Sequence, residues 1–97
     1  MMMGAGAEEC AHITEMYQSA KSPAAITTLD IMVGAWVGGF MTAANYYRAT
    51  GGEHMKDLSS SSMEQEIIAI RRYCKQHPDK LMMLGVATVF SGLSDQE

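Results

Sequence analysis

The sequence has few cysteines, few prolines and little positive charge. It contains two cysteines, two prolines and seven lysines and arginines against eleven aspartates and glutamates, a net charge of −4 over 97 residues. An acidic chain whose largest basic cluster is Arg71-Arg72 is a poor partner for nucleic acid. The longest apolar stretch, residues 31–41, is shorter than the roughly 20 residues of a membrane span. We therefore expect a buried helix there, and no membrane span.

Residue patterns for catalysis and metal binding are also missing. His12, His54 and His77 lie on three different segments, without carboxylates or cysteines at the spacing of metal ligands. The serine run 59–62 lacks the Gly-x-Ser-x-Gly motif of a nucleophile elbow, and it stands where serine commonly caps a helix. The sequence therefore predicts no enzyme, no metal site and no cofactor.

The N-terminal residues and the two cysteines indicate export. Ala5-Gly6-Ala7 before Glu8 is the small-x-small pattern after which signal peptidase cuts. We interpret residues 1–7 as a signal-peptide remnant or as residues added for expression, and 8–97 as one domain. A cytoplasmic protein with a Gly/Ala-rich start is the alternative. In an exported chain, Cys10 and Cys74 are expected to form one intramolecular disulfide.

Apolar periodicity and helix-breaking residues predict four helices and no strand. The expected segments are 8–19, 23–48, 62–77 and 78–92. Ser22-Pro23 resembles an N-cap followed by a first-turn proline, and Ser62 with Gln65 forms a capping-box pattern. His77-Pro78 should end the third helix, because proline disfavours helical geometry in the residue before it. The predicted fold is all-α, a small four-helix orthogonal bundle tied from the first helix to the third.

The second segment carries two stripes. Its apolar face comprises Ile26, Leu29, Val33, Trp36, Phe40 and Tyr47. We expect Trp36 and Phe40 to anchor the core from this face. Small residues at Gly34, Gly38 and Thr42 form the second stripe, which predicts that another backbone approaches closely there. In the third segment Met63, Ile67, Ile70 and Cys74 share a face, so Cys74 should point inward.

Methionine is unusually abundant, with ten residues in the chain. Its flexible, polarizable side chain suits surfaces that bind partners of many shapes. Met32, Met41 and Met83 lie near the edges of the apolar stripes, so they are our candidates for a client-binding or dimer surface. The alternative is that the methionines fill gaps in the core.

Several motifs together resemble the HdeA/HdeB family of periplasmic acid-stress chaperones. They are Cys10, the segment from Trp36 to Asn45, the run Tyr73-Cys74-Lys75-Gln76-His77-Pro78, and a final apolar helix. The Trp/Gly/Asn segment matches uncharacterised relatives better than the named chaperones. The resemblance implies a periplasmic HdeA-like homodimer without an active site, which loosens in acid and holds unfolding client proteins.

Two functions from different classes stay open, beside the alternative of a small structural protein without a client. The first is an acid-activated holdase. Protonating every carboxylate would leave seven basic side chains and three charged histidines, a net charge near +10 that favours loosening. The second is a periplasmic immunity protein that binds and inhibits a secreted toxin of the type VI amidase kind. For that role residues 51–57 are the one loop long and polar enough to enter a toxin cleft.

Overall fold

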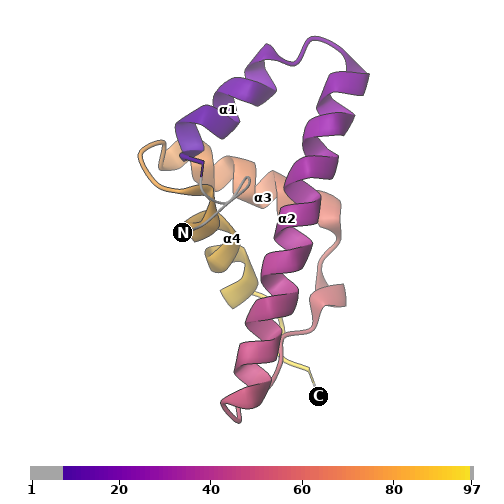
Figure 1. Cartoon of the computed structure of the whole chain (residues 1–97), viewed down its shortest axis with the longest axis vertical. Helices are drawn as coiled ribbons and strands as arrows, with labels where there is room; N and C mark the ends of the chain where they lie inside the picture. Colours follow the sequence, from indigo (N-terminus) through magenta and orange to yellow (C-terminus); the bar gives the residue numbers. More distant parts are fainter. Residues whose placement is uncertain (1–7, 97) are drawn as a thin grey trace.

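The computed structural model describes residues 8–96, which form an all-α bundle (Figure 1). The helices are α1 (Cys10–Ser19), α2 (Pro23–Thr50), the short 3-10 helix η2 (Leu58–Ser60), α3 (Met63–Gln76) and α4 (Met82–Ser91). Within these residues there is no strand beyond two isolated bridges, Glu9 with Leu81 and Lys56 with Asp95. The expected four-helix orthogonal bundle is confirmed, and Figure 1 shows α3 crossing α2 steeply. The interpretation of residues 1–7 lies outside the described part.

Local sequence signals start two of the helices. The backbone amide of Ala25 donates to the Ser22 hydroxyl over 3.1 Å, with Pro23 at the first helical position. Ser62 and Gln65 form the predicted reciprocal capping box at the start of α3. α4 begins at Met82 rather than at Pro78. Residues 78–80 form a turn that binds the start of α1: the carbonyls of Pro78 and Lys80 accept hydrogen bonds from the backbone amides of Ala11 and Cys10, respectively.

The disulfide joins α1 to α3 in the centre of the bundle. Cys10 and Cys74 are bonded, their Cα atoms are 4.5 Å apart, and both residues are fully buried. α1 has no side-chain cap at its N-terminus. The turn carbonyls of Pro78 and Lys80 take that place, so two of the amides that a helix start leaves unpaired are satisfied. One end of α1 is therefore fixed both covalently and by backbone hydrogen bonds.

The core contains aliphatic side chains from all four α-helices. α2 contributes Val33, Val37 and Met41, all at most 2 % exposed. The expectation that Trp36 and Phe40 anchor the core needs correction. They stack on each other with ring centroids 5.4 Å apart and lie half-buried at the edge of the core. Val33 is buried as expected, but beyond it the buried residues of α2 are Val37 and Met41, which directly follow Trp36 and Phe40. We attribute this to α3 and α4 packing against that side of α2. Tyr47, also expected on the core face, is 75 % exposed.

α2 is exposed over much of its length. Its most apolar 18-residue window has a mean hydropathy of 1.5, yet just 22 % of that window is buried. By length and composition α2 is long and apolar enough to cross a membrane, a test that core helices of soluble proteins also pass. Here α2 packs against α1, α3 and α4. The expectation of a buried helix therefore holds for one face of α2 and is wrong for the other.

Glycines in α2 and α4 play different parts from those expected. A Cβ added at Gly38 would meet no atom within 4 Å, so no backbone approaches there as the Gly34/Gly38/Thr42 stripe predicted. A Cβ at Gly85 would come within 2.8 Å of the Tyr73 ring. The glycine that close packing requires is therefore in α4, where it receives an aromatic ring from α3.

We predict opposite effects for alanine at these two glycines. Gly85→Ala should lower the free energy of unfolding by about 1–3 kcal/mol, because the ring of Tyr73 must move out of a packed core. Gly38→Ala should raise it by up to about 1 kcal/mol through helix propensity. Urea denaturation of both variants measures this. Equal effects at the two positions would contradict the α3–α4 packing described here.

Loss of the disulfide should be costly. The bond closes a ring spanning 64 residues, which the loop-entropy model values at about 4 kcal/mol. We expect Cys74→Ser to lower the free energy of unfolding by about 2–5 kcal/mol. Titration of the unfolded, unreduced wild type should find almost no free thiol. Two reactive thiols per chain would show that the bond does not form in solution.

Candidate functional site

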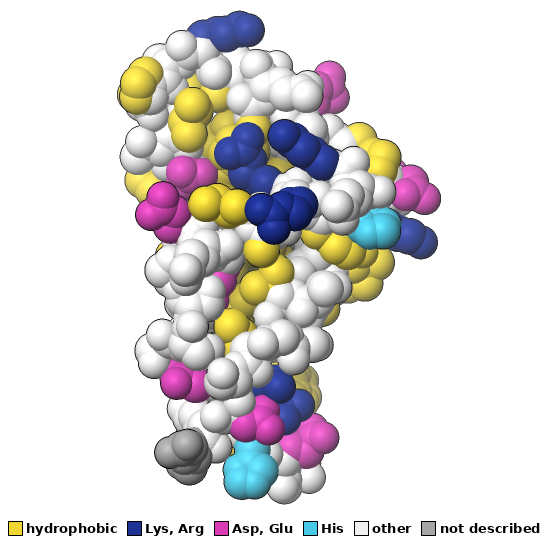
Figure 2. Space-filling model, turned by 180° about the vertical axis from the view of Figure 1, so that it is seen from behind, with side chains coloured by type: hydrophobic (Ala, Val, Ile, Leu, Met, Phe, Trp, Pro, Cys, Tyr) yellow, Lys and Arg dark blue, Asp and Glu magenta, His cyan; other side chains and the backbone are white. Residues whose placement is uncertain are grey.

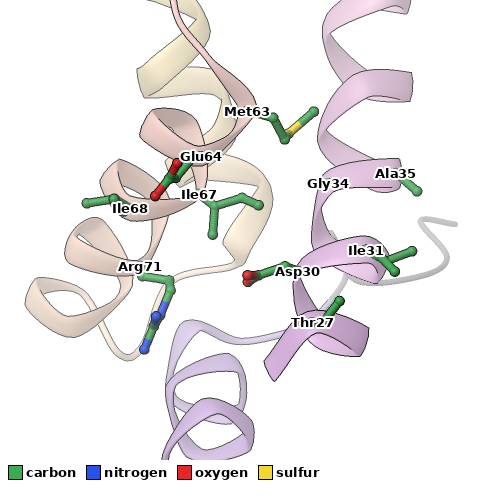
Figure 3. A pocket seen from close by; sticks show the side chains of 10 residues that line it. All are labelled: Thr27, Asp30, Ile31, Gly34, Ala35, Met63, Glu64, Ile67, Ile68 and Arg71. Atoms are coloured by element: carbon green, nitrogen blue, oxygen red, sulfur yellow. The ribbon is translucent and has the colours of Figure 1, made fainter. Parts of the chain in front are cut away.

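A groove with a volume of about 660 Å³ lies between α2 and α3. One wall comes from the N-terminal half of α2 and the other from the first half of α3. The lining residues are Thr27, Asp30, Ile31, Gly34 and Ala35 of α2, and Met63, Glu64, Ile67, Ile68 and Arg71 of α3. Figure 3 shows Asp30 and Arg71 toward one end and Met63 at the other, with Ile67 between the helices. We call this hollow the α2–α3 groove.

Small residues on α2 hold the groove open. Gly34 and Ala35 present almost no side chain toward α3, so the helices meet through the longer residues of α3. Met63 reaches across, and its sulfur lies 3.4 Å from where a Cβ on Gly34 would stand. The Gly34 part of the predicted small-residue stripe therefore receives a flexible side chain instead of a backbone.

One end of the groove is built by three helices. The hydroxyl of Tyr17 on α1 donates to the Asp30 carboxylate of α2 over 2.6 Å. The guanidinium of Arg71 on α3 lies 3.9 Å from the centroid of the same tyrosine ring. Burial and the hydrogen bond to Asp30 raise the pKa of Tyr17, so its hydroxyl stays protonated. The tyrosine thus positions a carboxylate and a cation at this end.

The rim of the groove is apolar and open to solvent. Ile31 is 67 % exposed, Ile68 49 % and Met63 42 %. With the buried Ile67 they are the large apolar side chains that line the groove from the two helices. Exposed apolar surface that is concave and rimmed by polar groups is typical of an interaction site.

The three predicted surface methionines do not lie together. Met32 is 41 % exposed on α2, Met83 is half-buried on α4, and Met41 is 2 % exposed in the core. Met41 as a surface residue is therefore wrong for the folded chain, because its face of α2 is the one that α3 and α4 cover. The sequence analysis missed Ile31 and Ile68, which fall outside the apolar stripes, and it assigned Met63 to the core.

A second cluster fastens the other end of the molecule. The buried side chain of Asn45 accepts from the Lys56 amide over 2.8 Å and donates to the Lys56 carbonyl over 2.9 Å. The Asp95 carboxylate lies 2.9 Å from the Lys56 ammonium and 3.7 Å from the Arg48 guanidinium. Backbone hydrogen bonds also link residues 55–57 to residues 94–96. We call residues 53–57 and 94–96, with Arg48 and Asn45, the C-terminal clasp.

The carboxylates of the molecule respond to acid in two ways. In the clasp, the ion pair with Lys56 lowers the pKa of Asp95, and hydrogen bonds from Ser59 lower that of Asp57. These groups stabilise the fold above the carboxylate pKa of the unfolded chain, and the contribution is lost as the pH falls through their lowered values. Burial raises the pKa of Glu66 on α3, whose Oε2 has no hydrogen-bond partner in the described part of the chain.

Glu66 therefore opposes acid unfolding. A carboxyl group with a raised pKa in the folded state costs stability when it ionises, and protonation removes that cost as the pH falls through the raised value. Acidification weakens the clasp while it relieves the strain of a buried charge on α3. The two ends of the molecule are thus expected to differ in acid resistance.

Comparison with known proteins identified no relative: no family model, no curated protein sequence and no solved structure matches this chain. Within residues 8–96, no group of three or more histidine, cysteine or acidic side chains is placed to hold a metal ion. The site must therefore be interpreted from its own chemistry, which is that of an apolar groove with charged ends.

We predict that Asp95→Asn loosens the clasp at neutral pH and has no such effect in strong acid. The variant should melt below the wild type at pH 7, and the difference should shrink toward zero as the pH falls through the lowered pKa of Asp95. Hydrogen exchange of the amides in residues 53–57 should accelerate at pH 7. Asp79→Asn, in the exposed turn before α4, makes the same charge change outside the clasp and is the control. A melting difference that persists at pH 2 would rule out this ion-pair mechanism.

Proposed function

We propose that the protein is a holdase-type chaperone of the periplasm, which binds apolar segments of unfolding proteins in the α2–α3 groove. The observation that carries the proposal is the exposure of Ile31, Ile68 and Met63 around a concave apolar hollow in a small stable fold. The Cys10–Cys74 disulfide fits an oxidising compartment. The resemblance to the HdeA/HdeB family motivates the periplasmic assignment.

The groove suits segments of varied sequence better than one rigid ligand. Met63 spans it from α3, and Met32, which follows Ile31 in α2 but does not line the groove, is also exposed. Unbranched methionine side chains adapt to different shapes, as a binder of many clients requires. The polar groups lie at the edges and at the Tyr17 end, so the centre can accept an apolar side chain without leaving a polar group unpaired.

Acid provides a way to enlarge this surface. Protonation of Asp95 removes the carboxylate that Lys56 and Arg48 share, so these two cations lose their common partner. The segments next to the clasp carry Leu58 and Leu93, which pack in or against the same core cluster as Met41. Release of the clasp would therefore expose apolar surface at one end, while the disulfide keeps α1 and α3 together. In this mechanism Met41 acts only after the clasp opens.

A dedicated binding protein, such as a toxin-inhibiting immunity protein, is the second candidate. One observation favours it: the 51–57 loop is held in a single shape. The Arg48 side chain donates to the His54 carbonyl over 2.6 Å, and Asn45 pairs with both backbone groups of Lys56. A loop ordered before binding loses little entropy on entering a cleft, as a tight specific inhibitor needs.

We predict that stoichiometric amounts of this protein suppress the aggregation of an acid-unfolded client, and that the groove is the site of binding. A client acidified to between pH 2 and 5 and then neutralised should scatter less light with this protein present. The double variant Ile31→Ser with Ile68→Ser should lose most of that protection, because it removes exposed apolar area and no core contact. Ile26→Ser with Leu84→Ser, at residues 39 % and 40 % exposed outside the groove lining, is the matched control.

Two results would contradict the chaperone. One is the absence of suppression at every pH in that range. The other is equal loss in both double variants, which would assign the effect to general surface apolarity instead of the groove. Tight binding of one toxin, abolished by changes in the 51–57 loop, would favour the immunity function.

A further inference from the structure

We propose that the α2–α3 groove and the basic side chains beside it together recognise polypeptide segments that carry both apolar and acidic residues. This inference rests on the proposed role of the groove in binding polypeptide and adds the charge of the bound segment. It concerns binding at neutral pH, where the carboxylates of a partner are ionised.

Three basic residues lie directly beside the groove. Arg71, Arg72 and Lys75 line a second, smaller hollow of about 350 Å³ together with Ile68. Ile68 and Arg71 line both hollows, so the apolar and basic surfaces are continuous. Figure 2, which views the molecule from behind, shows Lys and Arg side chains gathered beside apolar ones on this face. We call Arg71, Arg72 and Lys75 the basic patch.

The basic patch forms no ion pair within the described part of the chain. The ion pairs found there involve Arg48 and Lys56 in the clasp and His12 near the start of α1, and none involves the patch. In a protein of net charge −4, three cations within one hollow are a local reversal of sign. Such a reversal attracts an acidic partner and orients it.

Arg71 is positioned before any partner arrives. Its guanidinium lies over the Tyr17 ring, and that ring is held by the hydrogen bond to Asp30. A guanidinium fixed by stacking retains edges that can donate in pairs to a carboxylate, and it loses less entropy on binding than a free side chain. The apolar and acidic groups of a partner should be close together, since Ile68 and Lys75 are about 10 Å apart along α3.

The shape and remaining charges favour a polypeptide over an anionic membrane. The apolar part is a concave groove of about 660 Å³, which fits side chains better than a flat bilayer. Asp30 and Glu64 line the same groove and would repel a uniform layer of anionic head groups. A polypeptide can instead place its carboxylates over the basic patch alone.

The test uses two labelled amphipathic peptides, one of leucine and glutamate and one with lysine in place of glutamate. In low-salt buffer at pH 7, fluorescence anisotropy should show the glutamate peptide binding about tenfold more tightly or better. The double variant Arg72→Glu with Lys75→Glu should remove that preference, and added salt should weaken it. Lys21→Glu, in the exposed loop between α1 and α2, should change the affinity by no more than about twofold.

The outcomes separate this inference from the proposed function. Equal binding of both peptides, lost in the Ile31→Ser/Ile68→Ser variant, keeps the groove and overturns the charge preference. Binding of neither peptide overturns both. Binding to anionic phospholipid vesicles but to neither peptide would assign the basic patch to a membrane and overturn the inference. Arg72→Gln with Lys75→Gln supplies a milder variant, and circular dichroism verifies that each variant is folded.

Discussion

The disulfide between Cys10 and Cys74 is the constraint on which the rest of the structure depends. α1 is a helix of ten residues without a side-chain cap, and such a helix is unstable in isolation. The disulfide and the carbonyls of the turn at residues 78–80 hold its start against α3. Tyr17 on that helix then reaches Asp30 and Arg71, so the end of the groove is built on α1. Removing the bond would affect the site as well as the fold.

The long helix α2 is the second determinant of the structure. It is twice as long as the next longest helix, α3, and its C-terminal end extends beyond α3 and α4, so its neighbours can cover just part of it (Figure 1). The uncovered part remains apolar, with Ile31 on one side of the groove. Exposed apolar area of this kind lowers solubility unless it is used, which is why we place the binding function on this helix.

Buried and surface carboxylates have opposite effects on the stability of the molecule in acid. Asp95 and Asp57 favour the closed clasp at neutral pH, whereas Glu66 costs stability there and recovers it in acid. An acidic net charge by itself predicts global loosening at low pH. The placement of these three carboxylates predicts a local opening instead, at the C-terminal end of α2, with the disulfide-linked half retained.

Much of the fold was determined by the sequence alone. Ser22-Pro23, the Ser62–Gln65 capping box and His77-Pro78 are signals read within one turn of the chain, so two helix starts and one helix end were predicted correctly. The cysteine pair predicted the α1–α3 link, because two thiols in an oxidising compartment have only each other as partner. The tertiary structure decided which side of α2 faces inward, since apolar residues nearly surround that helix and periodicity cannot choose among them. In the folded chain Met41 therefore lies in the core and Trp36 at its edge. The glycine in close contact with a neighbouring helix is Gly85, and not Gly38 as the sequence predicted. The groove and the basic patch depend on how helices distant in sequence cross. Ile31 and Ile68 come to opposite sides of one groove, and Tyr17 meets Arg71, through packing that no local pattern encodes.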